Sequence, residues 1–361
     1  MDVHYGLIGT SELLKEKEPE GTWSFSGMTQ RSFSEMEKSE GREAALLELG
    51  LRIEHNLSLT KDILEFIPKI NIRHYRISSS IFSLAADYKD DIDASVTILP
   101  NSSKILDLIR AIGFSARQNN VTLSVYPDST NNLSSNDDNL VEKTIQELNF
   151  HSWFFETAGF SASPANPIII KPFGQPSENS HAGAVSFVQS FYSNFEKLNS
   201  DTQKRLVLQN EEEGFWNPIN LFKYFHVYLN EKHEKGVPLS YYNVADLRNP
   251  GKIDNQIIEK EVNIGAFHET WSGVVPVFLW SEKEGTSKTP ADFLTEAIPY
   301  FNYNIKWECD IKTRDKGIAK FTMPESEDKV TEEVIMTITK NKYSKSRDAS
   351  RSFNALYDKI Q

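Results

Sequence analysis

Short apolar runs recur along this chain, and amphipathic stretches lie between them. Runs of this length that are rich in β-branched and aromatic residues are typical of buried strands. We expect eight strands, at His4–Gly9, His74–Ser79, Val121–Pro127, Pro167–Phe173, Arg205–Glu211, Val237–Asn243, Val275–Ser281 and Asn304–Asp310. Strands that alternate with helical segments predict parallel β-α-β units.

Apolar residues with helical spacing fill several of the intervening segments. In residues 103–118, for example, Ile105, Leu108 and Ile112 lie on one stripe behind possible N-caps at Ser102 and Ser103. We expect helices at Ser103–Gln118, Ala182–Leu198, Pro218–Lys232 and Ala291–Phe301. Residues 10–40 form a polar stretch before the first helical pattern, and Val330–Lys340 is expected to form a last helix.

Eight strand–helix units predict one α/β domain, a single (β/α)8 TIM barrel, instead of an open doubly wound sheet. The first expected strand is not followed by a glycine-rich phosphate loop, which argues against a dinucleotide-binding fold. A length of 361 residues suits such a barrel. We expect the barrel to span residues 1–321 and a short C-terminal extension, a helix and tail, to span 322–361.

Composition narrows the class of protein. No apolar run approaches the ~20 residues that a membrane span needs, and the first residues do not read as a secretion signal. Cys309 is the single cysteine, so an intrachain disulfide is excluded and a cytoplasmic location is expected. The net charge of −12 disfavours DNA as a partner, because Lys and Arg supply most sequence-independent affinity for DNA. A local basic groove could still bind DNA.

Five segments resemble the UV-damage endonuclease (UvdE) family. They are Asn71–Ala86 (NIRHYRISSSIFSLAA), Val121–Asp128 (VTLSVYPD), Ile168–Gly174 (IIIKPFG), Arg205–Glu212 (RLVLQNEE) and Thr270–Ser281 (TWSGVVPVFLWS). The resemblance covers about Tyr5 to Phe321. It implies a xylose-isomerase-like TIM barrel that cuts DNA beside UV lesions. It also implies a cluster of divalent ions, such as Mn, at the carboxyl mouth of the barrel.

Most metal-ligand positions that the resemblance implies carry other residues in this chain. The implied histidines fall on Asp87, Tyr126, Lys171, Leu279 and Pro290, the implied glutamate of the fifth strand falls on Gln209, and the sixth-strand ligands fall within Tyr241–Asp246. Only Glu308 is kept, although Asp87 could still bind a cation. Metal clusters need several imidazoles and carboxylates that converge. We therefore expect no metal cofactor.

The framework residues that the resemblance implies are kept more often than the ligands. They include Arg76, Ser78, Ser79, Asn210, Trp271, Gly273, Pro276, Ser281 and Asp292. The family's pair of residues that pushes into the DNA duplex falls on Ser129 and Thr130, which are too small to stack on a base. This pattern is typical of a barrel that keeps its framework while its catalytic residues are replaced.

A barrel mouth without metal ions must neutralise its carboxylates in another way, because an unpaired buried charge is costly. The candidate pocket consists of Asp87, Tyr126, Lys171, Gln209, Asn210, Glu211, Tyr242, Leu279 and Glu308. We expect Lys171 to pair with Glu308 or Glu211 in place of the metals. Alternatively, Lys171 reaches solvent at the rim or acts as a nucleophile, and Glu211 to Glu213 form a solvated acidic loop.

The eight histidines do not form a close pair with metal-ligand spacing, so each is expected to be structural or solvent-facing. Three functions remain open. The first is a non-catalytic UvdE-like pseudoenzyme that binds an unknown protein or small molecule. The second is a divergent DNA-repair endonuclease with a reduced site at Asp87, Glu211 and Glu308. The third is a metal-free enzyme that works through Lys171, Tyr126 and Glu308.

Overall fold

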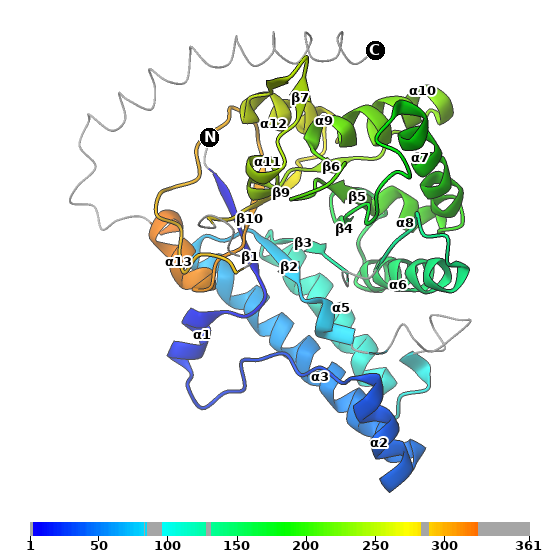
Figure 1. Cartoon of the computed structure of the whole chain (residues 1–361). Coiled ribbons are helices and arrows are strands. Elements are labelled where there is room, and N and C mark those ends of the chain that lie inside the picture. Colours follow the sequence, from blue (N-terminus) through cyan, green and yellow to red (C-terminus); the bar gives the residue numbers. More distant parts are fainter. Residues whose placement is uncertain (1–2, 83, 85–95, 128–130, 283–288, 324–361) are drawn as a thin grey trace, which may run out of the picture.

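Eight parallel strands form the centre of the molecule (Figure 1). The structure is a computed structural model that describes residues 3–82, 84, 96–127, 131–282 and 289–323. The strands are β1 (His4–Ile8), β2 (His74–Ile77), β3 (Thr122–Val125), β4 (Ile168–Ile170), β5 (Leu206–Gln209), β6 (Leu239–Ser240), β9 (Val277–Trp280) and β10 (Lys306–Cys309). Each lies within a predicted run, so the prediction of eight strands is confirmed.

The sheet closes on itself. Its strands are ordered β6-β5-β4-β3-β2-β1-β10-β9, and a parallel bridge between Tyr242 and Leu279 joins the two ends. At this seam the amide of Leu279 donates a hydrogen bond to the carbonyl of Tyr241 at 2.8 Å. Following the paired residues once around the barrel leads from β3 back to β3 at a position shifted by eight residues. This offset, the shear number, is that of a TIM barrel. The predicted (β/α)8 barrel is therefore confirmed.

Helices surround the barrel (Figure 1). They are α1 (Glu12–Lys17), α2 (Gln30–Glu40), α3 (Arg42–Phe66), α5 (Ser102–Gln118), α6 (Asp138–Thr157), α7 (His181–Phe195), α8 (Ser200–Arg205), α9 (Pro218–Leu221), α10 (Leu229–His233), α11 (Asn243–Arg248), α12 (Lys260–Glu269) and α13 (Arg314–Thr322), with short 3-10 turns η1 (Ile67–Ile70) and η2 (Ser79–Phe82) and a small hairpin of β7 (Lys252–Ile253) and β8 (Gln256–Ile257). In the part of the chain that is described, no helix combines the length and apolar character needed to cross a bilayer.

The expected helices meet four outcomes. Helices α5 and α7 confirm the predictions for Ser103–Gln118 and Ala182–Leu198. The segment Pro218–Lys232 is helical, but its middle is a π-helical stretch, η4 (Phe222–Tyr228), between α9 and α10. The polar stretch 10–40 contains α1 and α2, and α2 projects away from the barrel with the start of α3 (Figure 1). Val330–Lys340 lies outside the described residues.

The predicted helix at Ala291–Phe301 is wrong, because this segment is irregular. Its backbone groups bond to distant segments: the amide of Ala291 donates to Glu282 at 2.9 Å, and the carbonyl of Asp292 accepts from Thr313 at 2.9 Å. Pro299 also lacks the amide proton that a continuing helix would use. Bonds to the ends of β9 and α13 therefore replace bonds within a helix.

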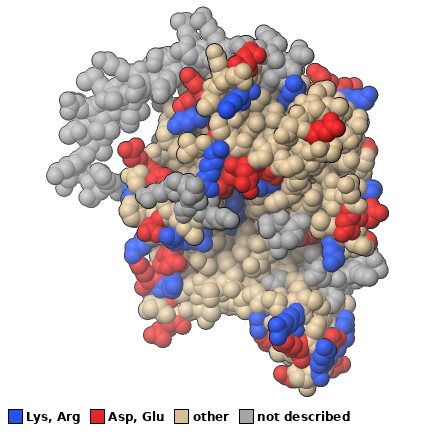
Figure 2. Space-filling view, in the orientation of Figure 1, with Lys and Arg blue, Asp and Glu red and all other residues tan. Residues whose placement is uncertain are grey.

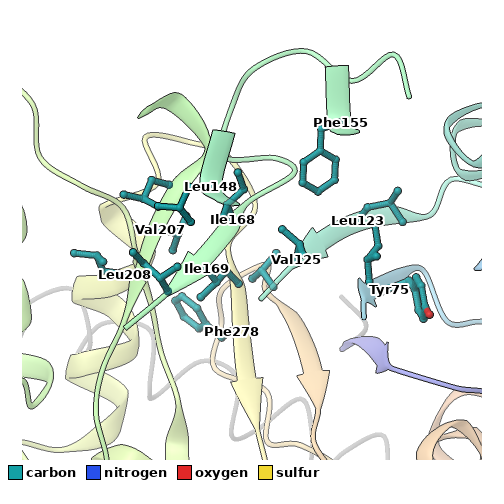
Figure 3. Packing of buried hydrophobic residues seen from close by; sticks show 14 of the residues in the cluster. Tyr75, Leu123, Val125, Leu148, Phe155, Ile168, Ile169, Val207, Leu208 and Phe278 are labelled. Atoms are coloured by element: carbon teal, nitrogen blue, oxygen red, sulfur yellow. The ribbon is translucent and has the colours of Figure 1, made fainter. Parts of the chain in front are cut away.

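The outer faces of the strands form a continuous apolar core with the helices. Figure 3 shows this packing: Leu148 and Phe155 of α6 lie over strands β3 and β4, near Leu123 and Ile168. These four side chains are fully buried. Burial of a large apolar side chain stabilises a fold by about 1.5–3 kcal/mol, so this layer holds the strands in place regardless of what the interior of the barrel contains.

Asn210 fastens β5 to the seam of the barrel. Its side chain is fully buried, its Oδ1 accepts from the amide of Tyr242 at 2.7 Å, and its Nδ2 donates to the carbonyl of Tyr242 at 3.2 Å. Strand β6 is only two residues long, and the side-chain amide therefore continues its pairing beyond Ser240. This position supports the backbone beneath the mouth.

We predict that Asn210→Ala lowers the free energy of unfolding by about 2 kcal/mol, because two buried backbone groups of Tyr242 lose their partners. Urea denaturation followed by circular dichroism measures the change. The matched control is Asn230→Ala, at an exposed position on α10, which should change stability little. Equal stability of the two variants would contradict the role given to Asn210.

Candidate functional site at the barrel mouth

Alternate residues of each strand point into the barrel. The pairing registers place Tyr242, Leu279 and Glu308 side by side, because Leu279 pairs with both of the others. By the same alternation, the candidates that face the interior are Tyr126, Lys171, Gln209, Glu211, Tyr242, Leu279 and Glu308. Asp87 lies outside the described residues. Most of the predicted pocket thus converges on one end of the barrel.

A buried carboxylate organises this interior. Glu308 on β10 is fully buried, and its Oε1 accepts hydrogen bonds from Nε2 of His74 at 3.0 Å and from the hydroxyl of Ser124. Its Oε2 accepts from Nη2 of Arg76, with which it forms an ion pair. Nδ1 of His74 lies 2.8 Å from the hydroxyl of Thr122. Both carboxylate oxygens are therefore occupied by side chains from β2 and β3.

Gly6 makes this meeting possible. On β1 it pairs with Glu308 on one side and with His74 on the other, so its position lies between the two side chains. A Cβ atom at Gly6 would come within 2.8 Å of Cδ2 of His74. The missing side chain therefore lets a group from β10 reach across β1 to β2.

The electrostatics of the cluster favour a charged carboxylate and a neutral imidazole. Burial alone would raise the pKa of Glu308, but the charge of Arg76 and the hydrogen bond from His74 outweigh it and lower the pKa to about 2. Burial lowers the pKa of His74, so the neutral ring donates from Nε2 and accepts at Nδ1. Burial also lowers the pKa of Lys306, at the other end of β10, to about 8, against the attraction of Glu308.

Arg76 also contacts an aromatic ring of the mouth. Its Cζ lies 5.2 Å from the ring centroid of Tyr126, in the geometry of a cation–π interaction. Burial raises the pKa of Tyr126, so its hydroxyl keeps its proton at all physiological pH values. One guanidinium group therefore connects the carboxylate inside the barrel to an aromatic residue nearer the rim.

The cation Lys171 acts on Glu211, whereas Glu308 has other partners. Glu211 is 8% exposed and accepts a hydrogen bond from the amide of Phe173 at 3.1 Å. Burial raises the pKa of Glu211 to about 7, although the charge of Lys171 and the bond from Phe173 oppose the shift. Of the two carboxylates expected to pair with Lys171, Glu211 is the one whose pKa its charge lowers. Glu308 is paired with Arg76 and His74 instead.

A second charged pair lies at the rim. Arg248 of α11 forms an ion pair with Glu212, which follows Glu211 along the chain. Burial, and then the negative charges of Glu212 and Asp310, raise the pKa of Tyr242. Gln209 is buried beneath them, with its Nε2 3.5 Å from the hydroxyl of Ser240. The mouth is thus lined by charges of both signs and by two tyrosines.

Three members of the cluster were not among the predicted pocket residues, and one of them, Arg76, was expected only as a framework residue. His74 was expected to be structural or solvent-facing, and Ser124 was not singled out. A signal did exist in the sequence, because His74 and Arg76 are two residues apart on one strand and therefore share a face. The sequence pattern did not show that Glu308 lies opposite these two side chains.

The described residues at the mouth do not fit a metal cluster. Glu308 already binds Arg76, His74 and Ser124, and the positive charge of Arg76 would repel a cation at this carboxylate. Within the described ranges there is no group of three or more His, Cys, Asp or Glu side chains that could hold a metal ion. The donor set therefore argues against the divalent ions that the family resemblance implies.

Fold and site together define an eight-stranded β/α barrel with a charged cluster at its carboxyl end. The family model described as UV-endonuclease UvdE matches residues 3–226, which is more than half of the chain. The chain therefore belongs to the UvdE family.

Individual relatives agree with this assignment. The UV DNA damage endonuclease of Nostoc sp. is 27% identical over 191 residues, which is 53% of this chain and 53% of the relative. That of Bacillus cereus is 23% identical over 215 residues, or 60% and 61% of the two chains. The matches therefore span about half to three-fifths of these relatives. The crystal structure of SacUVDE shares the fold, with a TM-score of 0.66 at 20% identity over 93% of this chain and 99% of that chain.

We predict that Glu211→Gln stabilises the protein at high pH. The folded-state pKa of Glu211 is raised to about 7, so its contribution to stability is present below its ordinary pKa of 4.5 and is lost as the pH rises to about 7. Relative to the parent, the variant should gain ~3 kcal/mol between pH 4.5 and pH 8.

Denaturant unfolding at a series of pH values measures this gain. Glu231→Gln is the matched control, because Glu231 is an exposed glutamate on α10. A difference in the free energy of unfolding between the parent and Glu211→Gln that does not change with pH would show that burial does not raise the pKa of Glu211.

Proposed function

We propose that this member of the UvdE family has lost metal-dependent endonuclease chemistry and that its barrel mouth serves as a binding site. The observation that carries the proposal is the cluster of Glu308 with Arg76, His74 and Ser124. Among the described positions, Glu308 is the only implied metal ligand whose residue type this chain keeps. Here it is part of a closed set of hydrogen bonds inside the protein.

Energetics support this assignment. A divalent ion at Glu308 would have to displace Arg76, which forms an ion pair with it. Removal of one partner from a buried ion pair costs about 3–5 kcal/mol, because the other charge is left uncompensated. The neighbouring interior positions, Tyr126, Lys171 and Leu279, provide no carboxylate or imidazole to repay that loss. The chain therefore holds its own charges more favourably than it would hold a metal ion.

The surface agrees with a reduced role for DNA. The net charge is −12, and on the face shown in Figure 2 acidic and basic side chains of the described residues are interspersed, without a broad basic area. Sequence-independent affinity for DNA depends on such basic areas. We propose a small molecule or a protein as the partner.

The names of the relatives favour a different function, a divergent UV-damage endonuclease. A reduced site for that chemistry would use Asp87, Glu211 and Glu308. Glu308 is bound to Arg76. The pKa of Glu211 is raised to about 7, and a carboxyl group that keeps its proton binds metal ions poorly. The two functions differ in an outcome that is simple to measure.

We predict that the purified protein contains no stoichiometric Mn, Zn or Fe and does not nick UV-irradiated supercoiled plasmid in the presence of Mn²⁺. Elemental analysis and a gel assay for plasmid relaxation measure the two outcomes. An active UV-damage endonuclease, assayed in parallel, shows that the damaged plasmid is a competent substrate. Lesion-dependent nicking would establish the endonuclease function instead, and stoichiometric bound metal would contradict a mouth without metal ions.

A further inference from the structure

A cavity of about 340 Å³ lies at the amino end of the barrel, opposite the mouth. Its walls are the end of α7, the helix α8, and the loop of residues 235–238 that leads into β6. Cavities of this size hold small molecules in other proteins. Strands β5 and β6 begin at these walls and end at the mouth, so the length of the barrel separates the two places.

Hydrogen bonds fix both walls of this cavity. On one side, Nε2 of Gln203 in α8 donates to the carbonyl of Leu198 at 2.9 Å, which holds α8 against the end of α7. On the other side, the amide of Val237 donates to the carbonyl of Phe225 at 3.1 Å, and the carbonyl of Val237 lies 3.3 Å from Nδ1 of His226. Phe225 and His226 belong to the π-helical stretch η4, which therefore anchors the loop. The cavity exists without a ligand to shape it.

The base of the cavity is apolar and its rim is polar. The side chains of Phe195 and Val237 line the base and are 5% and 3% exposed. At the rim lie the exposed residues Ser200, Lys204 and Lys235. An apolar base with a few polar groups at one edge suits a ligand that has an apolar body and a polar end.

The two lysines of the rim differ in their partners. Nζ of Lys204 lies 3.2 Å from Asp201, in an exposed ion pair. Within the described part of the chain, the side chains of Lys235 and Ser200 make neither a hydrogen bond nor an ion pair. The rim therefore offers one ammonium group and one hydroxyl group that internal partners do not occupy.

We propose that this cavity binds a small aromatic carboxylate, with the carboxylate on Lys235 and Ser200 and the ring on Phe195 and Val237. A carboxylate carries the one negative charge that a single ammonium group balances, and its second oxygen can accept from the hydroxyl. A ring in the ligand would pack favourably on the ring of Phe195. The site lies apart from the mouth, so the proposal goes beyond the proposed function and does not depend on it.

The test titrates the full chain with phenylacetate, and calorimetry records the binding. Lys235→Met removes the charge but keeps the length of the side chain, and should weaken binding about tenfold, the loss of one charge-assisted hydrogen bond. Phenylacetamide has the shape of phenylacetate without its charge and should bind the parent about tenfold more weakly for the same reason. Lys232→Met, at an exposed lysine of α10 outside the cavity, is the matched control and should bind phenylacetate like the parent.

Thermal unfolding of each variant checks that the fold persists, which is expected because both lysines are exposed. The proposal is overturned if phenylacetate does not bind, if phenylacetamide binds the parent as tightly, or if Lys235→Met and Lys232→Met bind phenylacetate equally. Because Lys235 lies at the opposite end of the barrel from Glu308, each of these results is separate from metal content and from the nicking assay.

Discussion

A single buried carboxylate, Glu308, sets the constraint on which the rest of the barrel interior depends. A negative charge without partners inside a protein costs several kcal/mol, so Glu308 requires donors on the strands around it. Arg76 and His74 supply them from β2, and Ser124 supplies another from β3. These strands are not neighbours of β10, and the contact exists only because Gly6 leaves the intervening position empty.

The cluster divides the barrel interior into two unlike sides. On β10, β2 and β3 the inner residues near Glu308 are charged or polar, whereas Ile169 of β4 and Val207 of β5 give the opposite strands an apolar lining. Both carboxylate oxygens of Glu308 accept hydrogen bonds from the polar side chains, so they are not open to a cation. The groups that remain directed toward the mouth are Lys171, Glu211 and the tyrosines, and these favour hydrogen-bonded ligands over metal coordination.

The strands could be predicted from the sequence because their apolar residues lie on the helix-facing side, where burial alone fixes them. The helix at Ala291–Phe301 could not be excluded, because bonds to Glu282 and Thr313 are tertiary and leave no local pattern. The partner of Glu308 was also beyond the sequence. Lys171 and Arg76 both point inward. Only the shear of the closed barrel shows that Arg76 is level with Glu308, whereas Lys171 lies nearer Glu211.

The likeness to SacUVDE is one of fold. The fold is shared at 20% identity, and the stabilising apolar layer lies between strands and helices, away from the strand ends. A substitution at the mouth therefore costs little stability if it leaves no charge unpaired. Tyr126 and Leu279 satisfy this condition because they are neutral, and Lys171 satisfies it because Glu211 lies beside it. Glu308 does not have that freedom: once Arg76 and His74 enclose it, replacement of either partner exposes a buried charge. The charged cluster is thus the part of this interior that is hardest to change, because each of its charges depends on the other.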